Sequence, residues 1–333
     1  MFISQIKKYT SVSFVGMAKN TGKTTCLNYV LSKLKDENYK VAITSIGVDG
    51  EEKDILYDTL KPRITIHKDN IFITSEKHFK EKKLEAKILH ISKQQTALGK
   101  LITAEALSTG QIILSGPTNS ELMANYIQKI KNFDVQLTLV DGALNRMSLA
   151  SPTVTEALVL CTGAACSKKI EQLIKNTKYQ CDMINIEKIN DKILKKIINT
   201  NTGVWAVNEN DITKLADSLF TSNINVDNFL QTSKNIYIAG ALTDSFMKEI
   251  IKRKVEGLNI IIPDFSNIFI SPHFFYKFIR RGGKFYVKQK ANLIAICSNP
   301  TSPEGINYAP EELLEALKTE LKIPVYDIIL DAP

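Results

Sequence analysis

Short runs of β-branched and other hydrophobic residues alternate with helix-length segments through most of the chain. This alternation is typical of βαβ units and of a parallel sheet. The pattern predicts strands at residues 12–15, 41–45, 112–115, 137–140 and 157–161. It predicts helices between them at residues 24–35, 95–107, 120–130 and 168–175. Residues 48–92 are less regular, with strands near 64–66 and 71–74, and indicate an insertion or a sheet edge.

A second alternating series begins near Thr202. It predicts strands at residues 203–207, 235–239, 259–262, 291–297 and 324–330, and helices at 244–254 and 310–321. We therefore divide the chain into residues 1–201 and 202–333, with the polar stretch 221–228 as the least hydrophobic candidate junction nearby. The second part is either a separate α/β domain or an extension of the first sheet, because periodicity does not separate the two.

The composition is that of an ordinary globular protein. The chain has 333 residues, of which 44% are hydrophobic and 23% are charged. These values exclude disordered, collagen-like and membrane-spanning classes. No apolar run approaches the roughly 18 residues that a transmembrane helix needs, and the first nine residues do not resemble a secretory signal. We expect a cytoplasmic protein without a membrane partner.

The distribution of charge and the spacing of the cysteines exclude some classes of partner and of metal site. The net charge is +8, carried almost entirely by lysines spread over helical segments. A nucleic-acid surface would instead interleave arginines with aromatic residues, so no nucleic-acid partner is expected. The cysteines have no CxxC spacing and no histidine at metal-ligand spacing, and they are interpreted as reduced, mostly buried thiols. They are Cys26, Cys161, Cys166, Cys181 and Cys297.

Residues 13–25 carry the most informative motif. A hydrophobic strand runs through a glycine-containing loop into a helix, which is the context of a phosphate-binding P-loop. Lys23 would reach the β- and γ-phosphates as a catalytic group, and the Thr24 hydroxyl would bind Mg²⁺. The candidate nucleotide-binding residues are Gly16, Lys19, Asn20, Thr21, Gly22, Lys23, Thr24 and Thr25. The motif predicts an α/β, P-loop NTPase-like fold, with a mostly parallel sheet and helices on both faces.

The motif departs from the standard pattern at one position. GxxxxGK[ST] would place its first glycine at Met17, whereas the nearest glycine is Gly16, one residue earlier. A structural loop that matches by accident is therefore the alternative.

Two aspartates follow predicted strands and are candidate Mg²⁺ ligands. Asp141 comes directly after residues 137–140, as the carboxylate of a Walker B strand would. Asp49 follows the second predicted strand, where it would face the γ-phosphate and orient water or metal. The alternatives are a turn aspartate before Gly142 and a solvated acidic loop. Glu51, Glu52 and Asp54 are weaker candidates.

Four further loops follow predicted strands. In residues 115–119, Thr118 or Asn119 is expected to cap the next helix rather than to bind a ligand. Residues 162–167 either contact a base or partner or provide close packing of small residues. Residues 240–244 and 299–305 match no known phosphate-binding pattern.

Several sequence blocks in the first 170 residues resemble one protein family. They are residues 15–25 (VGMAKNTGKTT), 45–50 (SIGVDG), 95–99 (QTALG), 139–146 (LVDGALNR) and 148–152 (SLASP). These blocks are similar to the KamB subunits of lysine 5,6-aminomutase reactivases. From Thr202 onward the similarity is thin.

The resemblance implies a function. Members of this family are ATP-dependent partners of adenosylcobalamin-dependent aminomutases in amino-acid fermentation. With a second, MutS-like ATPase subunit they exchange damaged cobalamin on the mutase for fresh cofactor. By resemblance, Lys23, Thr24, Asp49 and Asp141 would be the ATP and Mg²⁺ residues. The chain lacks the Asp-x-His-x-x-Gly motif that ligates cobalamin, so it is not expected to be the mutase itself.

Two other functions stay open. The first is a P-loop enzyme that uses ATP on a small molecule, of the dethiobiotin-synthetase or cofactor-biosynthesis kind, which would turn over without a protein partner. The second is a scaffold that binds ATP without hydrolysing it. The sequence does not choose between lysine and ornithine aminomutases as the client, nor does it give the oligomeric state.

Overall fold

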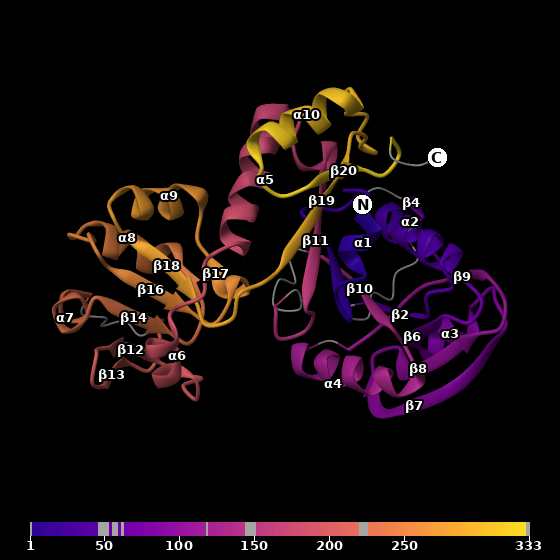
Figure 1. Cartoon of the computed structure of the whole chain (residues 1–333), viewed down its shortest axis with the longest axis horizontal. Helices are drawn as coiled ribbons and strands as arrows, with labels where there is room; N and C mark the ends of the chain where they lie inside the picture. The colour runs from indigo at the N-terminus through magenta and orange to yellow at the C-terminus, as the bar shows by residue number, and fades with distance from the viewer. Residues whose placement is uncertain are drawn as a thin grey trace. The chain divides into compact units, whose positions relative to one another are not determined.

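The computed structural model describes residues 2–45, 53–54, 59–60, 63–117, 119–143, 151–219 and 226–330. The chain forms two compact units (Figure 1). The first comprises Met1–Lys178 together with Asn292–Pro333, and the second comprises Tyr179–Ala291. Helix α5 (Ile170–Ile184) carries the chain out of the first unit. The second unit is thus an insertion between two parts of the first.

The first unit is built on a nine-stranded sheet in the order β20-β19-β11-β1-β10-β2-β6-β8-β7. Neighbouring strands are parallel from β20 to β6, whereas β8 is antiparallel to both of its neighbours, β6 and β7. The strands are β1 (Ser11–Gly16), β2 (Val41–Ser45), β6 (Ile71–Ser75), β7 (Ala86–Thr96), β8 (Gly99–Ala106), β10 (Leu137–Ala143), β11 (Ala157–Gly163), β19 (Leu293–Asn299) and β20 (Val325–Asp327). Strand β1, which precedes the predicted P-loop, lies in the interior of this sheet.

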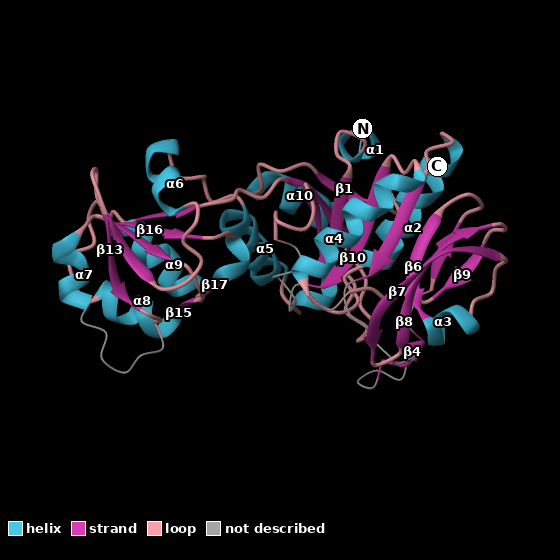
Figure 2. Ribbon diagram, turned by 90° about the horizontal axis from the view of Figure 1, so that it is seen from below, coloured by secondary structure: helices cyan, strands magenta, loops and turns pink. Residues whose placement is uncertain are grey.

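Helices cover both faces of the sheet, which confirms the expected arrangement (Figure 2). On one face, α2 (Lys23–Asp36) buries Leu27 and Leu31 in the same core cluster as Ile43 and Leu139. On the other face, α4 (Ser120–Ile130) packs against Ala42 and Val140, which are adjacent in sequence to Ile43 and Leu139 respectively. Because successive side chains of a strand point to opposite faces, this alternation places the two helices on opposite sides.

Short elements complete the first unit. The helical ones are α1 (Phe2–Ile6), α3 (Glu76–Lys80), α10 (Pro310–Glu320) and the 3₁₀ turns η1 (Lys131–Phe133) and η3 (Ala164–Cys166). Two antiparallel strand pairs lie outside the large sheet: β3 (Lys53–Asp54) with β4 (Thr59–Leu60), and β5 (Ile64–Ile66) with β9 (Gly110–Ile112).

The second unit has its own five-stranded sheet, in the order β13-β12-β14-β16-β18. Its strands are β12 (Val204–Val207), β13 (Ile212–Ala216), β14 (Asn235–Ile238), β16 (Asn259–Ile262) and β18 (Lys284–Val287). Strands β14, β16 and β18 are parallel, and β12 is antiparallel to both β13 and β14. The remaining elements are α6 (Asp191–Ile197), α7 (Val226–Thr232), α8 (Asp244–Ile251), α9 (Pro272–Arg280), η4 (Phe265–Asn267), β15 (Leu242–Thr243) and β17 (Ile268–Phe269).

The division of the chain differs from the single boundary predicted after residue 201. Both alternatives for residues 202–333 occur in part. The residues up to Ala291 belong to a separate α/β unit, whereas β19 and β20 extend the first sheet. Strand β19 pairs with β11 in parallel, with Cys161 opposite Cys297. Strands β19 and β20 take these positions because they bury hydrophobic side chains at the edge of the first sheet. The local sequence pattern does not encode which sheet edge a strand joins.

Two predicted elements are wrong. Residues 95–107 form the end of β7, a tight turn and β8, not a helix. Gly99 adopts a φ of 90° after this turn, and β8 is paired on both sides, so sheet pairing outweighs the helix-forming alanines and leucines. Of residues 112–115, only Ile112 lies in a strand, β9, which stands outside the large sheet.

None of the described helices is long and apolar enough to cross a membrane.

Candidate functional site

The loop between β1 and α2 is tightly closed on itself. A Cβ atom at Gly16 would lie 2.6 Å from the Thr21 hydroxyl oxygen and 3.1 Å from the Ala18 carbonyl oxygen. The Thr21 hydroxyl donates to that same carbonyl over 3.1 Å, and Thr21 is only 2% exposed. A side chain at Gly16 would therefore displace the Thr21 hydroxyl from its bond to Ala18 and disturb the loop. The glycine offset from the standard pattern has a structural role in this loop.

Helix α2 begins without the usual stabilising residues. Its N-cap is Gly22, at a left-handed φ of 78°, and its first turn contains no acidic residue. Lys23 instead places a positive charge at the positive end of the helix dipole. Helix starts ordinarily carry a capping side chain and acidic residues, which satisfy the exposed N–H groups. This start is instead suited to receive an external anion.

Lys23 and Asp141 are brought together by the parallel pairing of β1 with β10. Phe14 of β1 lies opposite Asp141, and the Lys23 ammonium forms an ion pair with the Asp141 carboxylate. Their side chains are only 21% and 16% exposed. Ser45, the last residue of β2, lies opposite Asp141 on the other side and directs its hydroxyl to the Asp141 carbonyl oxygen over 3.4 Å. Asp141 lies within β10, which continues through Ala143, rather than just after a strand as predicted.

Asn299, at the end of β19, supports the loop from the other side. Its Nδ2 donates to the Asn20 carbonyl oxygen over 3.1 Å. Its Cβ lies 3.0 Å from the position that a Cβ atom would take at Gly22. The sequence assigned no role to residues 299–305, because nothing local links them to residues 16–22. Only the placement of β19 in the first sheet reveals this contact.

The other predicted site residues lie in different environments. In the first turn of α2, Thr24 is half-buried and Thr25 is exposed. Lys19 is exposed at the middle of the loop, and Asn20 has a positive φ of 62°. Asp49, Glu51 and Glu52 lie outside the described residues, as does the side chain of Asp54.

Three of the other strand-end loops have residues with structural hydrogen bonds. Asn119 caps α4, since its side-chain oxygen accepts the Leu122 N–H over 2.8 Å, as expected. Thr162 is fully buried and shares a hydrogen bond of 2.9 Å with Thr177 of α5. This contact favours the packing interpretation of residues 162–167. In the second unit, Asp244 accepts the Ser271 N–H over 2.6 Å.

Three of the cysteines meet directly beneath the loop, although their sequence spacing gave no such indication. Cys26, Cys161 and Cys297 are all buried, and their sulfur atoms lie within 4.8 Å of one another. Burial raises the pKa of Cys26 and of Cys297. Hydrogen bonds from these two thiols, aided by the Lys23 charge, hold the pKa of Cys161 well below its usual value. The expectation of mostly buried thiols is confirmed, while their grouping is new.

Comparison with known proteins identified no matching family model, no similar curated protein and no similar solved structure.

Proposed function

We propose that the β1–α2 loop, residues 16–23, binds the phosphates of ATP together with Mg²⁺. The observation that carries this proposal is the ion pair between Lys23 and Asp141. It joins a lysine at a helix start to a carboxylate on the neighbouring parallel strand, 118 positions away. A lysine ammonium suits phosphate oxygens, and a carboxylate suits the hard Mg²⁺ ion. The pair therefore has the charges needed to bind both the phosphates and the Mg²⁺ ion of a magnesium nucleotide.

Each residue of the site would have its own role in binding Mg-ATP. Lys23 would leave Asp141 for the β- and γ-phosphates, and the Thr24 hydroxyl and Asp141 would turn to Mg²⁺. Bound Mg²⁺ would neutralise charge on the phosphates. The N–H groups at the start of α2 would face the phosphates, helped by the helix dipole. Asp49 remains our candidate for orienting water at the γ-phosphate.

We further propose that ATP use serves the reactivation of a cobalamin-dependent aminomutase. This step rests on the resemblance of residues 15–25, 45–50 and 139–152 to reactivase subunits. ATP binding and hydrolysis would favour two different states of this chain. These states would differ in affinity for the second subunit and for the damaged mutase, as any ligand-driven switch requires.

The nucleotide site is tested by thermal unfolding of the full chain with Mg-ATP, with Mg-GTP and without ligand. Binding at a hundredfold excess over Kd adds about 2.7 kcal/mol to the free energy of unfolding, which raises the midpoint visibly. Lys23→Ala should remove this shift. Lys35→Ala changes an exposed lysine at the far end of the same helix and should retain it. A shift that survives Lys23→Ala would reject the assigned site.

The cellular role needs a separate assay. An aminomutase inactivated by damaged cobalamin is incubated with this chain, the MutS-like subunit, ATP and fresh adenosylcobalamin. Recovery of mutase activity that requires ATP and fails with Lys23→Ala supports the reactivase. ATP binding without recovery would reject this role but leave the nucleotide site intact. ATP turnover on a small carboxylate or amine substrate, with no protein partner, would favour the dethiobiotin-synthetase-like alternative.

A further inference from the structure

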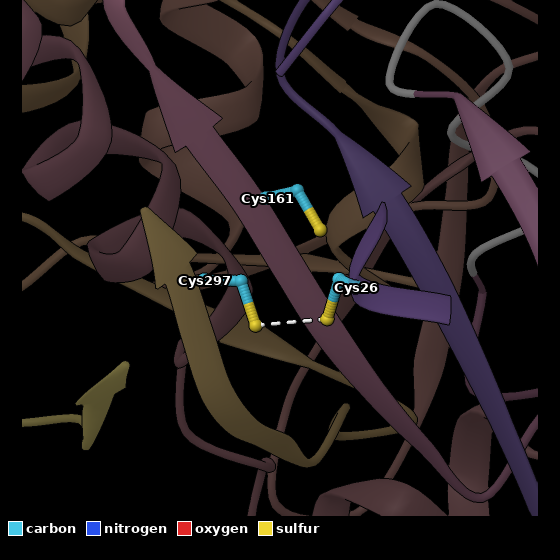
Figure 3. A group of neighbouring side chains, drawn as sticks. All are labelled: Cys26, Cys161 and Cys297. Carbon is cyan, nitrogen blue, oxygen red and sulfur yellow. Dashed lines mark hydrogen bonds between the residues drawn. The ribbon is translucent and has the colours of Figure 1, made fainter. Parts of the chain in front are cut away.

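The three grouped cysteines come from three different elements of the first unit. Cys26 lies in the first turn of α2, Cys161 in β11 and Cys297 in β19 (Figure 3). Their residues are 1%, 0% and 3% exposed. The Sγ atoms of Cys26 and Cys297 are 3.0 Å apart, and all three sulfurs lie within 4.8 Å of one another. In Figure 3 the Cys26 and Cys297 sulfurs lie side by side, and the Cys161 side chain lies next to them.

These distances are close to those of a metal site. An ion bound about 2.3 Å from each of three sulfurs holds them about 3.8–4.0 Å apart. Reaching this spacing requires changes of about 1 Å or less in the sulfur separations. A disulfide, by contrast, needs a bond of about 2.05 Å between only two of the sulfurs and would leave the third unused. The arrangement of three converging thiols thus fits an ion better than a single disulfide.

The surroundings select the kind of ion. Among the described residues, no histidine or carboxylate has a ligand atom within this group. The three cysteines belong to the hydrophobic core cluster that also contains Val159 and Ala295. Thiolates in a dry apolar setting select soft ions such as Zn²⁺ and Cu⁺ and disfavour Mg²⁺, which requires oxygen ligands. The group is therefore chemically distinct from the magnesium site proposed at Asp141.

We propose that Cys26, Cys161 and Cys297 form a buried three-thiolate site for one thiophilic metal ion, Zn²⁺ or Cu⁺. Binding replaces the thiol protons, which are released to solvent, and involves no change in oxidation state. The proposal does not depend on the function proposed for the loop above it.

Each cysteine is connected to a residue that positions this loop. The Cys161 carbonyl oxygen accepts the Met17 N–H, and the Cys26 N–H donates to the Gly22 carbonyl oxygen, both over 2.9 Å. Cys297 is two residues before Asn299, which holds the Asn20 carbonyl oxygen. An ion bound by the three sulfurs consequently fixes the beginning, the middle and the end of the loop. We expect it to order the loop before any other ligand binds.

Metal analysis of the full chain tests this site. The protein is purified under reducing conditions without chelators, then loaded separately with Zn²⁺ and, without oxygen, with Cu⁺. One arm should give about one ion per chain, and comparison of the two arms identifies the ion. Cys26→Ala, Cys161→Ala and Cys297→Ala should each lower the affinity at least tenfold. Cys181→Ala removes a buried cysteine outside the group and should not change it.

A measurement on the unmodified chain covers the case in which a variant fails to fold. X-ray absorption at the metal edge should show three sulfur neighbours at about 2.3 Å. Circular dichroism and thermal unfolding establish which variants are folded. The proposal is overturned if neither ion binds stoichiometrically, if binding persists in all three folded variants, or if oxygen or nitrogen ligands dominate the absorption spectrum. A Cys26–Cys297 disulfide in the protein as isolated from reducing conditions would also overturn it.

Discussion

Asn299 donates a hydrogen bond from its side chain to the main-chain carbonyl oxygen of Asn20, over a distance of 3.1 Å. The two residues are 279 positions apart, so the contact exists only because β19 returns to the first sheet beside β11. Asn20 itself has a positive φ of 62°, which an asparagine tolerates better than most residues. This bond therefore stabilises a backbone conformation that the loop sequence permits but does not enforce.

We expect Asn299→Ala to loosen the loop. Loss of the hydrogen bond should lower the free energy of unfolding by about 1 kcal/mol, and it should weaken any stabilisation by Mg-ATP. Thr301→Val serves as the control, because it replaces the hydroxyl that donates to the Asn299 side-chain oxygen over 3.1 Å and leaves the bond from the Asn299 Nδ2 to Asn20 in place. Denaturant titration of both variants with and without Mg-ATP measures the effect. Equal behaviour of the two variants would contradict a supporting role for Asn299.

Replacement of Gly22 separates backbone strain from crowding. Gly22 and Gly305 have nearly the same φ, 78° and 79°, so alanine at either position should cost about 1 kcal/mol for the left-handed conformation. A Cβ at Gly22 would also approach the Asn299 Cβ to 3.0 Å, whereas at Gly305 no other described atom lies within 4 Å. Gly22→Ala should therefore destabilise the protein more than Gly305→Ala does. Chemical unfolding of the two variants tests this, and identical losses would refute the contact.

The N-cap of α4 should respond to its side chain in a graded way. Asn119→Ala removes the acceptor for the Leu122 N–H and should cost about 1 kcal/mol of stability. Asn119→Asp keeps an acceptor and adds a favourable charge at the helix start, so it should retain most of the stability. Thermal unfolding near neutral pH compares the three proteins. A neutral effect of the alanine variant would show that the cap contributes little.

Glu156 should make stability depend on pH in the acid range. Burial opposes its ionisation, but the Thr10 N–H and hydroxyl donate to its carboxylate and outweigh that effect, which lowers the pKa of Glu156. A lowered pKa stabilises the folded state above the unfolded value of about 4.3, and this contribution is lost as the pH falls through the folded value.

Glu156→Gln tests this contribution by removing the charge while keeping an acceptor. Since the residue is exposed, the loss near pH 7 should be modest, about 0.5–1 kcal/mol. The difference between the two proteins should shrink as the pH falls below about 4. Urea titrations at several pH values measure it, and a difference independent of pH would rule out the charge as the cause.

Much of the first unit could be predicted from local patterns. The strands at 41–45 and 157–161 and the helices at 24–35 and 120–130 were anticipated, because each buries a regular hydrophobic face or a continuous apolar run. The prediction failed at residues 95–107, where helix-forming residues lie in a hairpin. Their pairing with β6 and β7 through the sheet outweighs their local preference.

The candidate site divides in the same way. Residues 16–25 were identified from one continuous segment, since a strand, a glycine loop and a lysine at a helix start lie within reach of local sequence reasoning. The hydrophobic run before Asp141 predicts a carboxylate at a strand end, whereas its ion pair with Lys23 depends on β10 lying next to β1. Neither the support from Asn299 nor the grouping of the cysteines has any local signal.

The sequence by itself determined the α/β character, the strand–loop–helix segment at residues 12–35 and a cap at Thr118 or Asn119. These depend on side-chain periodicity and on backbone preferences that act over a few residues. Only the tertiary structure decided that β19 and β20 complete the first sheet and that Lys23 meets Asp141. It also brought Cys26, Cys161 and Cys297 into one core. The order of strands in a sheet is set by which hydrophobic edges and faces bury one another, and that choice joins segments far apart in the chain.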